Sequence, residues 1–126
     1  MAQTTIIETC PIIRIEQQLG AEVIWREIEV CGSGSTNRLV LRLFDEQGRP
    51  LDLSGKEITF NAAIAMQDFS YTAEITGNEA VVDFSFVISA DTMGKYTIYV
   101  HDTQTSEYYV AAQGIMWVIN PLVDYT

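Results

Sequence analysis

The sequence predicts an all-β protein built as a two-sheet antiparallel β-sandwich. Most segments alternate apolar with polar residues, and residues that favour turns separate these segments at short intervals. No segment long enough for a helix shows a 3.6-residue apolar period. The chain has 126 residues, of which 48% are hydrophobic. This is enough for one sandwich core and too little for two, so a single folded domain is expected.

The alternation places strands along almost the whole chain. The predicted strands are residues 12–16, 22–30, 38–44, 56–64, 71–75, 80–88, 95–101, 107–112 and 115–119. Gly77 and Asn78 lie between two of them and predict a hairpin, because glycine adopts the positive φ that a two-residue loop requires at its first position.

Alternation within the strands also predicts which side chains face the core. One predicted inward face carries Ala80, Val82, Phe84, Phe86 and Ile88, and another carries Tyr96, Ile98 and Val100.

Two kinds of aromatic residue call for an interpretation of their own. Tyr96 is either a tyrosine corner, with its ring in the core and its hydroxyl bonded to nearby backbone, or an ordinary half-buried strand tyrosine. Trp25 and Trp117 lie in apolar-alternating strands, so we expect them to fill the core or the space between the sheets.

The connection from Asp45 to Gly55 has the composition of a loop between strands. Gly48 can adopt positive φ, Pro50 fixes its own φ, and Asp45 and Asp52 can accept hydrogen bonds from nearby amides. Later in the chain, Gly94-Lys95-Tyr96 opens another strand.

This loop and the later Gly-x-Tyr resemble a known family. The pattern is similar to that of the immunoglobulin-like N-terminal domain of baseplate upper proteins and related tail structural proteins of bacteriophages, over residues 22–121. The matching residues are Gly48, Pro50, Leu51, Asp52, Leu53, Ser54, Gly55, Gly94 and Tyr96.

The resemblance implies an immunoglobulin-like sandwich and a scaffold role in a virion assembled in the host cytoplasm. Baseplate upper proteins usually continue into a fibre or receptor-docking region, whereas this sequence ends at Thr126. We therefore do not expect receptor binding through such an extension.

The charge excludes some classes of partner. Seven lysine and arginine residues against 17 acidic residues give a net charge of −10, which argues against binding nucleic acid or an anionic membrane surface. The acidity is most simply interpreted as a source of solubility. Neither a signal peptide nor a transmembrane helix is indicated near the N-terminus.

No catalytic or cofactor site is expected. His101 is the single histidine, and it is interpreted as a polar residue on a strand face rather than as a catalytic base. Asp45, Glu46 and Asp52 match no calcium-loop spacing and are expected to be solvated. Cys10 and Cys31 lack metal-ligand spacing and are interpreted as buried thiols rather than a disulfide, because disulfides are rare in proteins assembled in a cytosol.

The N-terminal segment is the best candidate for an assembly element. We expect residues 1–20 to form an arm or a first strand and residues 21–126 to form the immunoglobulin-like domain. An arm could add its backbone to the sheet edge of a neighbouring subunit and bury its isoleucines there. Those residues are Ile6, Ile7, Ile12, Ile13 and Ile15. The alternative is a first strand within the same domain.

Three functions are compatible with these observations. The leading one is a non-enzymatic virion structural protein of a phage tail or baseplate that binds protein partners and forms a homo-oligomer. The second is a capsid decoration protein or the base of a head fibre. The third is a small carbohydrate-binding sandwich that stacks sugars on exposed tyrosines. The candidate tyrosines are Tyr71, Tyr99, Tyr108 and Tyr109.

Overall fold

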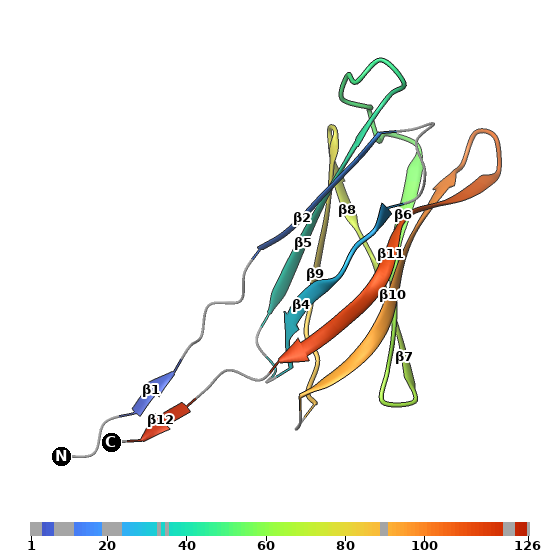
Figure 1. The fold of residues 1–126 in the computed structure, drawn as a ribbon. Helices are drawn as coiled ribbons and strands as arrows, with labels where there is room; N and C mark the ends of the chain where they lie inside the picture. The colour runs from blue at the N-terminus through green and yellow to red at the C-terminus, as the bar shows by residue number, and fades with distance from the viewer. Residues whose placement is uncertain are drawn as a thin grey trace.

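The fold is described from a computed structural model, which places residues 4–6, 12–18, 24–32, 34, 36–88, 91–119 and 123–125. Two sheets pack face to face, and no helix occurs in these residues (Figure 1). The strands are β1 (Thr4–Ile6), β2 (Ile12–Gln18), β3 (Ile24–Trp25), β4 (Ile28–Cys31), β5 (Asn37–Phe44), β6 (Lys56–Ile64), β7 (Gln67–Thr72), β8 (Glu74–Thr76), β9 (Glu79–Phe84), β10 (Thr92–Asp102), β11 (Glu107–Ile119) and β12 (Val123–Tyr125).

The strand order confirms the predicted sandwich. The small sheet has the order β2-β5-β9-β8, and the large sheet has the order β3-β11-β10-β6-β7, with β4 also paired to β11. The order is consistent with an immunoglobulin-like domain, in which strands A, B, E and D face a sheet built around C, F and G.

The expectation of purely antiparallel sheets is wrong, because both sheets are mixed. Strand β2 is parallel to β5, and β3 and β4 are parallel to β11. Parallel neighbours require a crossover between them. Here the chain leaves the small sheet after β2, forms β3 and β4 on the large sheet, and returns to the small sheet as β5.

The N-terminal segment resolves into two parts. Residues 12–18 form the first strand of the domain itself rather than a free arm. Ile13 and Ile15 are buried in the chain's own core, and Ile12 is exposed on the other side of β2. The strand that the alternation of apolar with polar residues predicted pairs here with β5 of the same chain.

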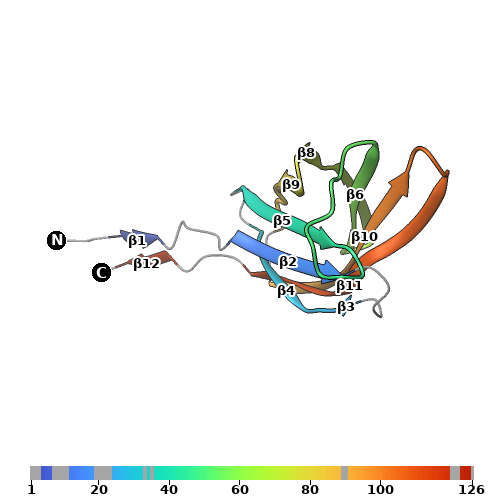
Figure 2. The same cartoon turned by 90° about the horizontal axis from the view of Figure 1, so that it is seen from above.

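The rest of the predicted arm contributes little to the described structure. Ile6 ends β1, which pairs with β12 of the same chain, and this ribbon projects from one end of the sandwich (Figures 1 and 2). Ile7 lies outside the described residues.

The β8–β9 hairpin was predicted from the sequence, and the β6–β7 hairpin was not. Gly77 has φ 62° and makes the predicted two-residue turn between β8 and β9. A second two-residue turn joins β6 to β7 through Ala65 and Met66, with φ of 50° and 64°. This turn was not predicted, because it contains neither glycine nor asparagine, the residues that usually adopt positive φ.

The core contains the predicted inward faces. Ala80, Val82, Phe84 and Phe86 from one segment are buried, and Ile88 packs against the core. Aromatic rings join the two sheets, with centroids of Phe60 and Phe84 4.7 Å apart. Burial of these side chains supplies the main favourable free energy of folding.

Tyr96 fastens the edge of the large sheet. Its side chain is 1% exposed, and its hydroxyl donates a 2.6 Å hydrogen bond to the backbone carbonyl of Arg26, in the short break between β3 and β4. A tyrosine corner would instead bond backbone a few residues upstream. The expectation of a ring in the core and a hydroxyl bonded to backbone is confirmed, but the bonded carbonyl is 70 residues away in the sequence, so the contact is not a tyrosine corner. The alternative of a half-buried strand tyrosine is wrong.

Gly114 on β11 allows the backbone at Arg26, between β3 and β4, to approach closely. It is the register partner of Tyr96, and a Cβ atom at this position would lie 2.2 Å from the carbonyl oxygen of Arg26. The amide of Arg26 also donates to the carbonyl of Gln113. The register of β3 on β11 continues without a shift into that of β4, so the two form one interrupted edge strand.

Asn37 links the two sheets at the start of β5. Its side-chain amide is buried and pairs with both the amide and the carbonyl of Cys31 on β4. Cys31 is disulfide-bonded, so the prediction of a free thiol is wrong for this residue. The prediction relied on the redox state of a cytosol rather than on geometry. Cys10 lies outside the described residues.

The loop of residues 45–55 closes one end of the sandwich. Leu53 is fully buried, and its amide donates to the carbonyl of Gly77 in the β8–β9 turn. Asp52 accepts hydrogen bonds from the amide and hydroxyl of Ser54, which lower the pKa of its carboxyl. Gly55, at φ 78°, brings the loop against the β10–β11 turn.

We predict that Tyr96→Phe destabilises the domain by about 1 kcal/mol, because the Arg26 carbonyl loses a partly buried donor. Tyr71→Phe is the matched control, since its hydroxyl donates to the Ser85 carbonyl at an exposed position and its loss should change stability by about 0.5 kcal/mol or less. Urea denaturation measures both. Equal losses in the two variants would contradict the role given to Tyr96.

Burial raises the pKa of Tyr96 from 10.0 to about 12, so stability should fall in alkaline solution. The folded protein holds the phenolic proton more tightly than the unfolded chain does. The contribution of the neutral Tyr96 side chain to the free energy of unfolding is therefore complete below pH 10. As the pH rises toward 12 this contribution is lost, which lowers the free energy of unfolding by about 2–3 kcal/mol. Urea denaturation of wild type and Tyr96→Phe across this range tests the assignment. A loss of the same size in both proteins would refute it.

Candidate functional site

The outer face of the large sheet is the most distinctive surface in the described residues. Odd-numbered residues of β10 and the odd-numbered residues 113–119 of β11 point outward, and the even-numbered residues beside them are buried. The face divides into an apolar part over β3, β4, β11 and β10 and a polar part over β10, β6 and β7.

The apolar part is a stripe of large side chains, called here the apolar stripe. Trp25 is 61% exposed, Met93 is 54% exposed and Trp117 is 40% exposed. Met93 and Trp117 are cross-strand partners, so their side chains lie side by side. The stripe consists of Trp25, Met93, Ile115, Trp117 and Ile119.

The placement of both tryptophans corrects a prediction. Trp25 and Trp117 were expected in the core, yet they lie on the outward side of their strands. The error is one of phase, because alternation identifies two faces without saying which one is buried. Met116 and Val118, on either side of Trp117, take the buried positions.

Acidic residues flank the stripe on its β4 side. Trp117 Nε1 donates a hydrogen bond of 3.3 Å to Glu27 Oε2, and Glu29 is the register partner of Trp117. Lys95 is on the opposite side of the stripe, in register with Ile115. No ion pair of Lys95 is found within the described residues.

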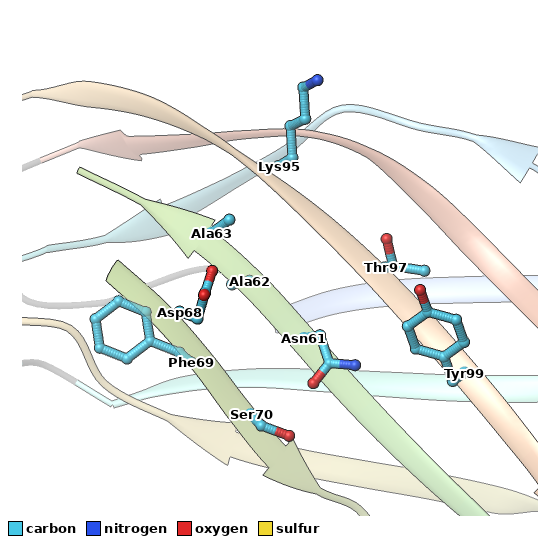
Figure 3. Close-up of a pocket in the computed structure, with 9 residues that line it drawn as sticks. All are labelled: Asn61, Ala62, Ala63, Asp68, Phe69, Ser70, Lys95, Thr97 and Tyr99. Carbon is cyan, nitrogen blue, oxygen red and sulfur yellow. The ribbon is translucent and has the colours of Figure 1, made fainter. Parts of the chain in front are cut away.

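The polar part contains a shallow hollow of about 310 Å³ (Figure 3). The short side chain of Ala63 lies between Lys95 on β10 and Asp68 on β7 in the sheet register. Polar atoms of Asn61, Ser70 and the neighbouring Thr97 and Tyr99 surround it. Neither Lys95 nor Asp68 forms an ion pair in the part of the chain that the structure covers, so the hollow keeps both charges available.

Most basic side chains are already paired within the molecule. Seven lysine and arginine residues occur in the sequence, and four of them form ion pairs with acidic residues in the described part of the chain. The pairs are Arg38–Asp83 at 2.8 Å, Arg42–Glu79 at 3.3 Å, Arg49–Asp45 at 3.4 Å and Lys56–Asp102 at 3.0 Å. The hydrogen bond from Arg38 lowers the pKa of Asp83. The remaining surface is therefore strongly acidic.

The single histidine lies at the far end of the same face. The His101 ring stacks on Tyr108, with centroids 4.1 Å apart, and its Nδ1 is 3.7 Å from Glu57 Oε2. This places His101 on a strand face. A search of the described residues finds no group of three histidine, cysteine or acidic side chains that could hold a metal ion.

The tyrosines expected to stack on sugars fall into two pairs. Tyr71 and Tyr109 pack against the core, and the Tyr71 hydroxyl donates to the Ser85 carbonyl. Tyr99 and Tyr108 are exposed, and Tyr108 covers His101. The structure does not gather the four into one platform.

The predicted site residues in the 45–55 loop and at Gly94 contribute to the packing of the fold. The loop of residues 45–55 closes one end of the sandwich. Gly94 passes so close to β6 that a Cβ atom would lie 2.5 Å from the Ala63 carbonyl oxygen. The apolar stripe was not predicted. Its signal was present in the sequence, because Met93, Ile115 and Trp117 share the phase opposite to the buried positions on β10 and β11.

The comparisons with known proteins concern the fold. No protein-family model and no curated protein matches the sequence. A solved structure of the N-terminal domain of phage TP901-1 ORF48 is similar, with a TM-score of 0.52 and 7% sequence identity over 89% of this chain and 94% of that chain. At this identity the likeness shows a shared fold. No helix in the described residues is long and apolar enough to span a membrane.

Tryptophan fluorescence should report the exposed stripe, because Trp25 and Trp117 are the only tryptophans in the sequence. We predict emission typical of a solvated indole and efficient quenching by both acrylamide and caesium. Iodide should quench less than caesium, because Glu27 and Glu29 repel an anion near Trp117. Trp117→Phe isolates the Trp25 signal as a control. Blue-shifted emission that resists all three quenchers would contradict the exposure of the stripe.

Proposed function

We propose that the chain is a structural component of a phage tail or baseplate and works through protein–protein contacts without catalysis. The observation that carries the proposal is the sandwich fold, shared over 89% of the chain with the N-terminal domain of a phage protein. The turn-rich loop at residues 45–55, which resembles that of baseplate upper proteins, lies within this fold and closes one end of it.

The chemistry of the surface supports a binding role. Large apolar side chains are exposed together on one sheet face, as occurs at protein interfaces. His101 is engaged by Tyr108 and faces Glu57, an arrangement without a nucleophile. We propose a virion location, assembly in the host cytoplasm and the presence of several copies in each particle.

Purified particles test this function. Tails and capsids of the virus that encodes the chain can be separated, and each fraction examined by quantitative mass spectrometry and by electron microscopy with gold-labelled antibody. We expect the chain in a fixed stoichiometry with tail proteins and gold label at the tail tip. Label on capsids would favour the decoration role, and absence from both fractions would contradict a virion role.

A further inference from the structure

We propose that the apolar stripe is the docking site for a different protein, one whose contact surface is apolar at its centre and carries lysine or arginine at its rim. The inference rests on the proposed virion function and names the surface and the chemistry of the partner. The stripe is Trp25, Met93, Ile115, Trp117 and Ile119, as defined above.

The composition of the stripe is that of an interface centre. Tryptophan and methionine are enriched in interfaces, and tryptophan is prominent among the residues that dominate binding energy. Here two tryptophans and a methionine are between 40% and 61% exposed on adjacent strands. Leaving them in water costs free energy that a partner would recover by covering them.

The surface around the stripe is already rigid. Two of the strands that carry it, β10 and β11, are paired with each other over a long register, and β3 and β4 pair with β11 on its other side. The Tyr96 hydroxyl and the contact at Gly114 hold the β3–β4 edge against β11, which fixes Trp25 relative to Trp117. A preformed surface loses little conformational entropy when it binds.

No other described part of the chain covers the stripe. The β1–β12 ribbon projects beyond the end of the sandwich rather than across this face (Figures 1 and 2). The β6–β7 turn, with the exposed Met66, lies at the end of the neighbouring strands β6 and β7.

Charge selects a different protein over a second copy. Glu27 and Glu29 flank the stripe, and Asp68 and Glu57 lie farther along the same face. The basic residues nearby are Lys95 and the exposed Arg26, so acidic residues are in excess. A second copy would bring the same acidic flank and another net charge of −10. A basic rim would instead be attracted to this face and would face Glu27 and Glu29 directly.

The test uses full-length variants supplied during particle assembly. Met93→Lys and Glu29→Lys change the stripe and its acidic flank at exposed positions. Met66→Lys and Glu46→Lys are matched controls, because they make the same substitutions at exposed residues away from the stripe. Incorporation per particle is measured by mass spectrometry relative to wild type, and thermal melting verifies that each variant is folded.

We expect Met93→Lys and Glu29→Lys to reduce incorporation about tenfold or more, and both controls to match wild type. Equal incorporation of all four variants would overturn the proposed surface while leaving the virion function intact. Absence of the wild-type chain from particles would instead refute the proposed function, and the inference with it.

Light scattering of the isolated chain tests the choice of occupant. We expect Met93→Lys to leave the solution mass of the wild-type chain unchanged. An oligomer that Met93→Lys dissociates would show that the stripe binds a second copy, and the proposal of a different, basic partner would be overturned.

Discussion

The hydrogen bond from the Tyr96 hydroxyl to the Arg26 carbonyl is the contact on which the large sheet's outer edge depends. That edge consists of two short strands separated by Arg26 and Glu27. A strand of two residues contributes little pairing of its own. The tyrosine reaches it from the middle of the core, where Phe60 packs against its ring, and Gly114 lets the backbone approach to a distance that any side chain would prevent.

The same contact couples the core to the candidate site. Trp25 and Glu27 lie on either side of Arg26, and Glu29 follows on β4. If the edge detached, one side of the apolar stripe and most of its acidic flank would move away from Met93 and Trp117. The stability of the edge and the shape of the proposed docking surface are therefore a single physical property of the fold.

Alternation was sufficient to predict the sandwich and much of its core, because a strand with one buried face has a period of two. It could not assign the buried phase where both faces carry large apolar residues, as on β11, where Met116 is buried and Trp117 exposed. The Ala65–Met66 turn could not be predicted either, since nothing in its residue types indicates positive φ. The disulfide at Cys31 depends on proximity in space, which spacing along the sequence does not give. The parallel pairing of β2 with β5 follows from the placement of β3 and β4 in the other sheet, which the sequence pattern does not indicate.

Amine cross-linking of intact particles tests whether the outer face of the large sheet contacts a different protein. The sequence contains two lysines: Lys95 borders the apolar stripe, whereas Lys56 is paired with Asp102 at the opposite end of the sheet register. We expect Lys95 to cross-link to another virion protein. Cross-links from Lys95 only to Lys95 of another copy, or none from Lys95 while Lys56 is linked to other proteins, would contradict it.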